Sequence, residues 1–158
     1  MSRAERIKAA KNKAARYCAG GERSPKKVLE KLQQYGLEHE ESEQVLADLI
    51  ALNFVNEERY ANAFVKDKFR FNKWGKKRIE MELANQQIDY QLIANALDEI
   101  NLSEYQQIIM GLAQQKWTSL SRESDDFIKK QKTIRFLLGK GFESDLAVKT
   151  VNHLTESS

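Results

Sequence analysis

Apolar residues recur along the chain in a pattern that repeats three times. In each copy, an apolar stripe, a short interruption and a second stripe have the spacing of two amphipathic helices joined by a tight turn. The first copy has apolar residues at Val28, Leu32, Leu37, Leu46 and Leu49. Positions 51 residues further on hold Ile79, Leu83, Ile88, Leu97 and Ile100, and positions 105 residues further on hold Thr133, Leu137, Phe142, Val151 and Leu154. Because only Thr133 departs from the pattern, we expect a tandem repeat.

The turn between the two helices carries glycine in two copies, at Gly36 and Gly141. Glycine often ends a helix because it adopts the left-handed backbone conformation at little cost. The middle copy has Gln87 at this place, which leaves the form of its turn open. An acidic residue, which complements the helix dipole, precedes the last helix of every copy: Glu38, Asp89 and Glu143.

A further candidate helix precedes each pair, at about residues 4–20, 57–72 and 103–117. We therefore expect an all-α chain of about nine helices, in three-helix repeats at 1–53, 54–101 and 102–158. The third repeat should contain a longer internal loop at 117–126, and residues 155–158 should form a frayed tail. Because neighbouring repeats must cover one another's apolar faces, the array should be elongated and curved, with a compact bundle as the alternative.

Composition supports this interpretation, because one proline and seven glycines in 158 residues leave few helix breakers. No apolar run approaches the roughly 18 residues of a membrane helix. The N-terminal segment is basic and lacks the hydrophobic stretch of a secretory signal. A single cysteine, Cys18, cannot form an internal disulfide, which is typical of reducing compartments. We expect a cytoplasmic monomer that does not bind membranes.

The sequence offers no constellation for catalysis. His39, His153 and Cys18 lie far apart without metal-ligand spacing. The pair Gly20-Gly21 lacks the Lys-Ser/Thr of a phosphate-binding loop, and no Gly-x-Ser-x-Gly motif occurs. We therefore expect a protein that is not an enzyme, with no metal and no cofactor.

Charge alternates along the chain although its net value is only +3. Residues 1–35 carry +7, 37–63 carry −6, 66–78 carry +6, 79–104 carry −6 and 105–158 carry +2. Such alternation suggests stripes of charge on the folded surface.

Basic residues also recur in register with the repeat, since Lys27, Arg78 and Lys132 are related by the same offsets of 51 and 105. We expect each near the start of its helix, where positive charge opposes the helix dipole by some tenths of a kcal/mol. A polyanion or an acidic protein surface would favour this placement, whereas a merely solvated face is the alternative. The predicted interface comprises ten residues: Lys26, Lys27, Lys73, Lys76, Lys77, Arg78, Lys129, Lys130, Lys132 and Arg135.

Aromatic residues interleave with the middle basic cluster. Stacking of Trp74 or Phe71 on nucleic-acid bases is one interpretation of this pattern. We favour the other, in which Phe69 and Trp74 pack the junction between two helices.

Two segments of the middle repeat, NFVNEERYA at 53–61 and KWGKKRI at 73–79, resemble the central signature of the RecX family. Ser24 with Gly36 is similar to that family's first repeat, and Lys140-Gly141-Phe142 to its last. The resemblance spans about residues 10–154, with Gln87 in place of the usual turn glycine.

RecX proteins regulate the bacterial RecA recombinase, so the resemblance implies roles in homologous recombination, DNA repair and the SOS response. It implies three-helix repeats, no enzymatic activity, and binding in the groove of the filament that RecA forms on single-stranded DNA. Family members restrain filament extension, ATP hydrolysis and strand exchange. The alternative is a helix-turn-helix-like module that binds DNA directly, without RecA.

Overall fold

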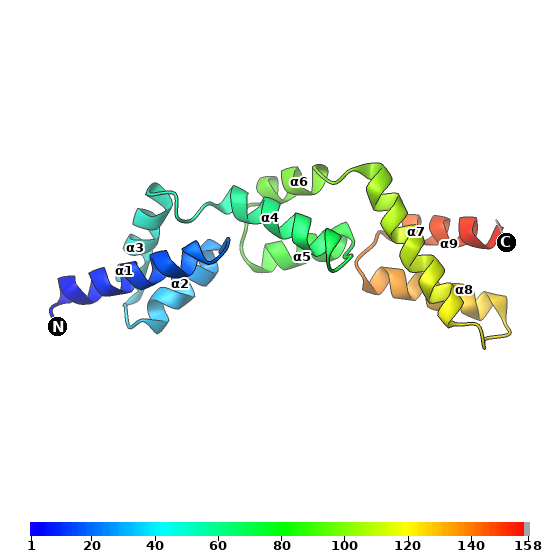
Figure 1. Cartoon of the computed structure of the whole chain (residues 1–158), viewed down its shortest axis with the longest axis horizontal. Coiled ribbons are helices and arrows are strands. Elements are labelled where there is room, and N and C mark those ends of the chain that lie inside the picture. Colours follow the sequence, from blue (N-terminus) through cyan, green and yellow to red (C-terminus); the bar gives the residue numbers. More distant parts are fainter. Residues whose placement is uncertain (157–158) are drawn as a thin grey trace. The chain divides into compact units, whose positions relative to one another are not determined.

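The computed structural model describes residues 1–156, which form nine helices and no strand (Figure 1). The helices are α1 (Arg3–Ala19), α2 (Pro25–Gln34), α3 (His39–Ala51), α4 (Glu57–Arg70), α5 (Lys76–Asn85), α6 (Tyr90–Asp98), α7 (Leu102–Ser119), α8 (Asp126–Gly139) and α9 (Ser144–Glu156). They follow one another in three groups of three, which confirms the predicted all-α tandem repeat. Within the described range, no helix is both long enough and apolar enough to cross a membrane.

The chain forms two compact units, and the division between them passes through the middle repeat. Unit 1 comprises Met1–Phe64 and Leu83–Ile93, whereas unit 2 comprises Val65–Glu82 and Ala94–Ser158. Unit 1 therefore joins the first repeat to the C-terminal end of α5, and unit 2 joins the third repeat to the N-terminal end of α5.

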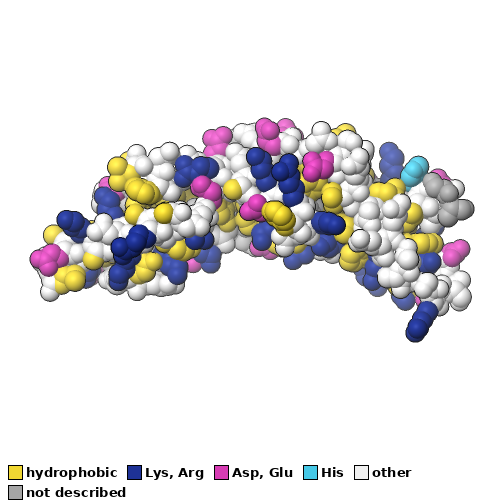
Figure 2. Space-filling view, viewed as in Figure 1, with side chains coloured by type: hydrophobic (Ala, Val, Ile, Leu, Met, Phe, Trp, Pro, Cys, Tyr) yellow, Lys and Arg dark blue, Asp and Glu magenta, His cyan; other side chains and the backbone are white. Residues whose placement is uncertain are grey.

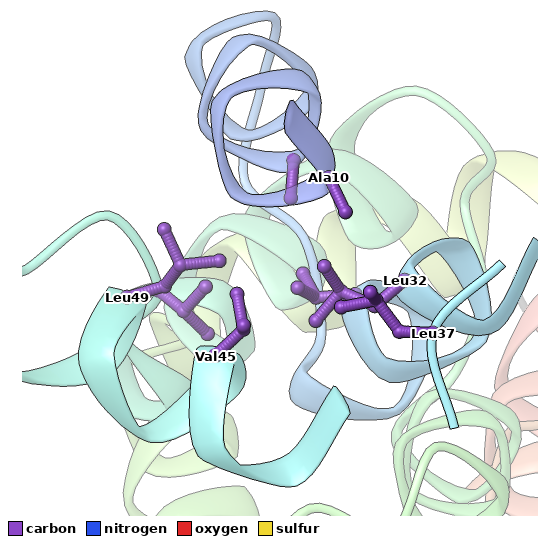
Figure 3. Packing of buried hydrophobic residues seen from close by; sticks show 8 residues of the cluster. Ala10, Leu32, Leu37, Val45 and Leu49 are labelled. Atoms are coloured by element: carbon purple, nitrogen blue, oxygen red, sulfur yellow. The ribbon is translucent and has the colours of Figure 1, made fainter. Parts of the chain in front are cut away.

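The core of unit 1 lies where α1, α2 and α3 converge (Figure 3). Ala10 lies on α1, Leu32 on α2 and Leu49 on α3, and each is at most 2% exposed. Leu37, after the α2–α3 turn, and Val45 complete the contact. Small residues on α1 let its backbone approach the other two helices, and burial of each leucine contributes about 1.5 to 3 kcal/mol.

The repeated apolar positions are buried in all three copies, apart from Leu46, Ile100 and Leu154, which are half-buried. The polar exception, Thr133, is also fully buried. Its hydroxyl donates to the carbonyl of Lys129 at 2.9 Å, one turn earlier in α8. Because the hydroxyl is satisfied within its own helix, threonine occupies an apolar position without an orphaned donor.

The turn after the second helix has the same form in all three repeats. Its central residues Gly36, Gln87 and Gly141 have φ angles of 95°, 59° and 97°. In each turn the next amide donates to a carbonyl five residues earlier at 3.2 Å, which is the Schellman arrangement. Gln87 therefore leaves the turn unchanged, although a left-handed conformation costs a residue with a side chain roughly 1 to 2 kcal/mol.

Charged residues tie α1 to the start of α3. Glu41 accepts from the amide of Glu38 at 3.0 Å, from Arg3 at 2.9 Å and from Arg6 at 3.1 Å. The backbone hydrogen bond, followed by the two guanidinium groups, lowers the pKa of Glu41 to about 2. The carboxylate thus stays ionised and holds α1 against α3.

The third repeat differs from the prediction around residues 117–126. Helix α7 continues through Ser119 and α8 begins at Asp126, so the loop is confined to 120–125. The side chain of Asp125 caps α8 by accepting from the amides of Phe127 at 2.9 Å and Ile128 at 3.3 Å. The extra residues lengthen α8 to 14 residues, against 10 in α2 and in α5.

The predicted frayed tail is helical at residues 155 and 156, which end α9. The remaining two residues of that prediction, 157 and 158, lie outside the described part of the chain.

Candidate functional site

The N-terminus of α5, in unit 2, is held by the third repeat. This helix has no acidic residue in its first turn. Its first-turn amides find acceptors elsewhere: that of Lys76 donates to the Tyr105 hydroxyl at 2.9 Å, and that of Lys77 to the Gly141 carbonyl at 3.0 Å. Helix N-termini need such partners because their first four amides have none within the helix.

Gly75 brings the two main chains into contact. Its amide donates to the carbonyl of Lys140 at 2.8 Å. A Cβ added at Gly75 would lie 2.3 Å from the carbonyl carbon of Gly141, much closer than packed atoms approach. Only glycine fits this position while the two backbones keep their spacing.

Tyr105 completes the junction as both an acceptor and a donor. It is 2% exposed, and its hydroxyl donates to Glu143 at 2.5 Å while accepting from the Lys76 amide. Burial, followed by the hydrogen bond to Glu143, raises the pKa of Tyr105 well above its usual range. The hydroxyl proton is therefore retained, as the donated bond requires.

Three cations gather beside this junction: Lys73, Arg78 and Lys140. The ammonium of Lys140 donates to the Asn72 carbonyl at 2.8 Å, and the guanidinium carbon of Arg78 lies 4.0 Å from the centre of the Trp74 ring. Burial, and then the charges of Arg78 and Lys73, lower the pKa of Lys140. No carboxylate among residues 1–156 forms an ion pair with any of the three. We call these residues the cation cluster.

Lys140 is the member of this cluster that the repeat pattern did not indicate. It is 62 residues from Arg78 along the chain, and only the docking of the α8–α9 turn on α5 brings them together. Its place next to the turn glycine Gly141 was the available signal, because that turn recurs in every repeat.

Several of the predicted interface residues have contacts within the chain. The ammonium of Lys26 donates to the Asn85 carbonyl at 3.0 Å, and that of Lys27 lies 3.5 Å from Glu30. The ammonium of Lys76 lies 5.2 Å from the centre of the Tyr105 ring. In contrast, the side chain of Lys77 is exposed.

The predicted interface residues of α8 also fall into two groups, those whose charged group contacts an acidic or aromatic side chain and those without such a contact among residues 1–156. The ammonium of Lys129 lies 4.2 Å from the centre of the Trp117 ring, and that of Lys132 lies 3.4 Å from Glu123. Lys130 is half-buried and Arg135 is exposed. The prediction that Lys132 lies near a helix start is wrong, since α8 begins at Asp126 and Lys132 lies in its second turn.

The aromatic residues of the middle cluster have separate environments. Phe69 is 2% exposed and its ring centre lies 5.8 Å from that of Tyr105, which confirms that it packs at a junction. Trp74 is half-buried and stacks with Arg78. Phe71, by contrast, is 80% exposed.

On the face that Figure 2 shows, basic and acidic side chains are interspersed over α4.

Family models match three successive segments of the chain. Residues 10–49 match "RecX, first three-helix domain", residues 56–97 match the second such domain and residues 103–150 the third. A regulatory protein RecX from Clostridioides difficile is 32% identical over 147 residues, which cover 92% of this chain and 68% of that protein. The chain belongs to the RecX family.

Other RecX proteins agree in sequence and in structure. The regulatory protein RecX from Neisseria meningitidis is 31% identical over 123 residues, covering 78% of this chain and 76% of that protein. The crystal structure of RecX from Lactobacillus salivarius matches with a TM-score of 0.85 and 25% identity, covering 96% of this chain and 98% of that one. These findings confirm the RecX resemblance and support a regulatory role for this chain.

Proposed function

We propose that this protein binds the filament of RecA on single-stranded DNA and inhibits ATP hydrolysis, filament growth and strand exchange by RecA. Membership of the RecX family supports this function, because the relatives are named regulatory proteins. The observation that carries it is the cation cluster, which lies in and beside the RecX-like segment 73–79 and is not neutralised by carboxylates of the described chain. A RecA filament offers both DNA phosphates and acidic protein surfaces to such a cluster.

A protein without catalysis can regulate an ATPase by preferring one of its states. If binding is tighter to one filament state than to another, the population shifts toward the preferred state by that difference in affinity. A preference of about 1.4 kcal/mol changes the ratio of the two states tenfold for each bound molecule. In this proposal the three repeats, at 1–53, 54–101 and 102–158, contact successive parts of the filament as a monomer.

The predicted interface residues are not equivalent in this proposal. Lys73, Lys77 and Arg78 form its centre, because they surround the start of α5 and have no ion-pair partner in the described chain. Lys27, Lys130, Lys132 and Arg135 add further positive charge to the contact with the filament in this proposal. The ammonium groups of Lys26, Lys76 and Lys129, which also contact a carbonyl or an aromatic ring, lie outside the cation cluster and are given no separate role in this proposal.

The direct test follows ATP hydrolysis by RecA and filament length on single-stranded DNA while the protein is titrated in. Reversing two charges, in Lys77→Glu with Arg78→Glu, should raise the concentration needed for half-inhibition about tenfold at moderate salt. Lys149→Glu is a matched control, because Lys149 is an exposed lysine of α9 in the same unit. Unchanged inhibition by a folded double variant would contradict the assignment of these residues.

Direct DNA binding without RecA is the second candidate, and the exposed Phe71 favours it. It requires tight binding to bare DNA, with a steep loss of affinity as salt rises. Weak binding to bare DNA that becomes strong on a RecA filament would instead support the filament as the target.

A further inference from the structure

We propose that Lys73, Arg78 and Lys140 bind a phosphodiester of single-stranded DNA, with Phe71 as a stacking surface for a neighbouring base. The inference rests on the proposed function and deepens it. It assigns this part of the protein to the DNA strand of the filament, whereas an acidic surface of RecA would be the other partner for the same charges.

The cations of this cluster have no carboxylate of residues 1–156 beside them, whereas other cations of the predicted interface form ion pairs. The ammonium of Lys27 has Glu30 at 3.5 Å and that of Lys132 has Glu123 at 3.4 Å. Lys73, Arg78 and Lys140 have no such partner in the described chain. Holding like charges close together raises the free energy of the unbound protein, and an anion between them lowers it.

The cluster is held in place before any ligand arrives. Lys140 is anchored on the Asn72 carbonyl at 2.8 Å, and Arg78 is stacked on Trp74. The main chain at Lys73, where φ is 55°, belongs to the turn after α4, and this turn is closed by the amide of Trp74, which donates to the Lys68 carbonyl at 3.1 Å. A preformed arrangement of this kind reduces the entropy lost on binding.

The exposed ring of Phe71 distinguishes single-stranded DNA from an acidic protein surface. Phe71 directly precedes Asn72, whose carbonyl anchors Lys140, and is 80% exposed although phenylalanine usually serves the core. A backbone-tracking set of cations combined with an exposed aromatic ring is the usual composition of a site for single strands, whose bases are open to stacking. Duplex DNA and acidic peptides offer no such base face.

Fluorescence anisotropy with a labelled oligo(dT), measured from low to moderate salt, tests the site directly. Lys73→Gln with Arg78→Gln should weaken binding about tenfold and reduce the slope of log K against log salt by about 0.7, one phosphate contact. Phe71→Ala should weaken binding about fivefold or more and leave the slope unchanged, because stacking releases no counterion. Lys140→Gln should act like the double variant, and Lys149→Gln should bind like the unmodified protein.

Each variant is checked by circular dichroism and urea unfolding, and Lys73→Gln alone replaces the double variant if the latter is unfolded. Affinities and slopes equal to those of the unmodified protein, or no oligo(dT) binding at low salt, would overturn the site. Lost inhibition of the RecA ATPase with intact oligo(dT) binding would assign the cluster to an acidic RecA surface, leaving the proposed function in place. Failure of the unmodified protein to inhibit RecA would overturn the proposed function itself, whatever the oligo(dT) results.

Discussion

The N-termini of α2 and α5 occupy equivalent places in the first and second repeats, but side chains hold the first, whereas main-chain carbonyls together with the Tyr105 hydroxyl hold the second. In unit 1 the hydroxyl of Ser24 accepts from the amide of Lys27 at 3.1 Å and donates to the side chain of Gln86 at 2.8 Å. The ammonium of Lys26 reaches the carbonyl of Asn85 at 3.0 Å.

In unit 2 the position of Ser24 is taken by Gly75, 51 residues further on. Its amide and that of Lys77 donate to the carbonyls of Lys140 and Gly141, at 2.8 and 3.0 Å. The backbone of Gly141 lies where a Cβ of residue 75 would be.

This difference changes what the basic residues can do. Lys26 and Lys77 are equivalent by the offset of 51, yet the ammonium of Lys26 is engaged in a junction while the side chain of Lys77 is exposed. Main-chain bonds at the start of α5 leave the side chain of Lys77 available to a partner. Recurrence of a charge in a repeat therefore indicates an equivalent position, and the local junction decides whether that charge supports the fold or a binding surface.

The substitution Gly75→Ala should have the largest effect, because its methyl group would overlap the backbone of Gly141. We expect unit 2 to lose about 3 kcal/mol of unfolding free energy. Both tryptophans, Trp74 and Trp117, lie in unit 2, so urea unfolding followed by tryptophan fluorescence reports on this unit. A loss below about 0.5 kcal/mol would show that the main chains can separate without cost.

The next largest effect should come from Tyr105→Phe, which removes the acceptor for the Lys76 amide and the donor for Glu143. Leaving these partners unsatisfied should cost about 2 kcal/mol. Tyr90→Phe, at a residue of unit 1 that is 71% exposed, controls for the loss of a phenol hydroxyl and should leave the unfolding midpoint of unit 2 unchanged. Equal unfolding midpoints for the two variants would refute a structural role for the hydroxyl of Tyr105.

Ser24→Ala tests the side-chain junction and should cost about 1 kcal/mol through loss of the helix cap and of the bond to Gln86. Because unit 1 contains no tryptophan, far-UV circular dichroism must follow this transition. Gln86→Ala removes only the second bond and should cost less. If Gln86→Ala lowered the free energy of unfolding more than Ser24→Ala, contacts of Gln86 would stabilise unit 1 more than the cap of α2 does.

The smallest effect, and one of opposite sign, is expected for Gln87→Gly. The φ angle of 59° at Gln87 suits glycine, so Gln87→Gly relieves backbone strain in the folded protein. Glycine also makes the unfolded chain more flexible, which offsets part of this gain, so we expect the free energy of unfolding to rise by somewhat less than about 1 kcal/mol. Gly36→Ala, at a φ angle of 95° with open space for a Cβ, should lose a similar amount. Destabilisation by Gln87→Gly would show that the glutamine side chain contributes more than its backbone costs.

Local patterns predicted most of the fold. The first helices expected at 4–20, 57–72 and 103–117 are found at Arg3–Ala19, Glu57–Arg70 and Leu102–Ser119. Helical periodicity is encoded by residues three and four apart, so it can be read without knowledge of the tertiary structure. The loop expected at 117–126 is shorter, at 120–125, because α7 continues through Ser119 into the run rich in Ser and charge, and Asp125 in that run caps α8.

The candidate site could be predicted only in part. Lys73, Lys77 and Arg78 stood out because they recur with the repeat or lie in the RecX-like segment. Lys140 did not, since the bond from its ammonium to the Asn72 carbonyl joins residues 68 positions apart. For the same reason the sequence did not indicate the hydrogen bond from the ammonium of Lys26 to the carbonyl of Asn85, which lies 59 positions away.

By itself, the sequence determined the helices, the three-fold repeat and the RecX family of this protein, because each depends on residue types at fixed local spacing. Only the tertiary structure decided which basic residues hold the repeats together and which remain exposed. The physical reason is that a cation's role depends on the carbonyls, carboxylates and rings that the fold brings within a few ångströms. Gly75 illustrates what each source decides. The sequence shows that residue 75 is a glycine, and the contact with Gly141 in the folded chain shows why no other residue fits there.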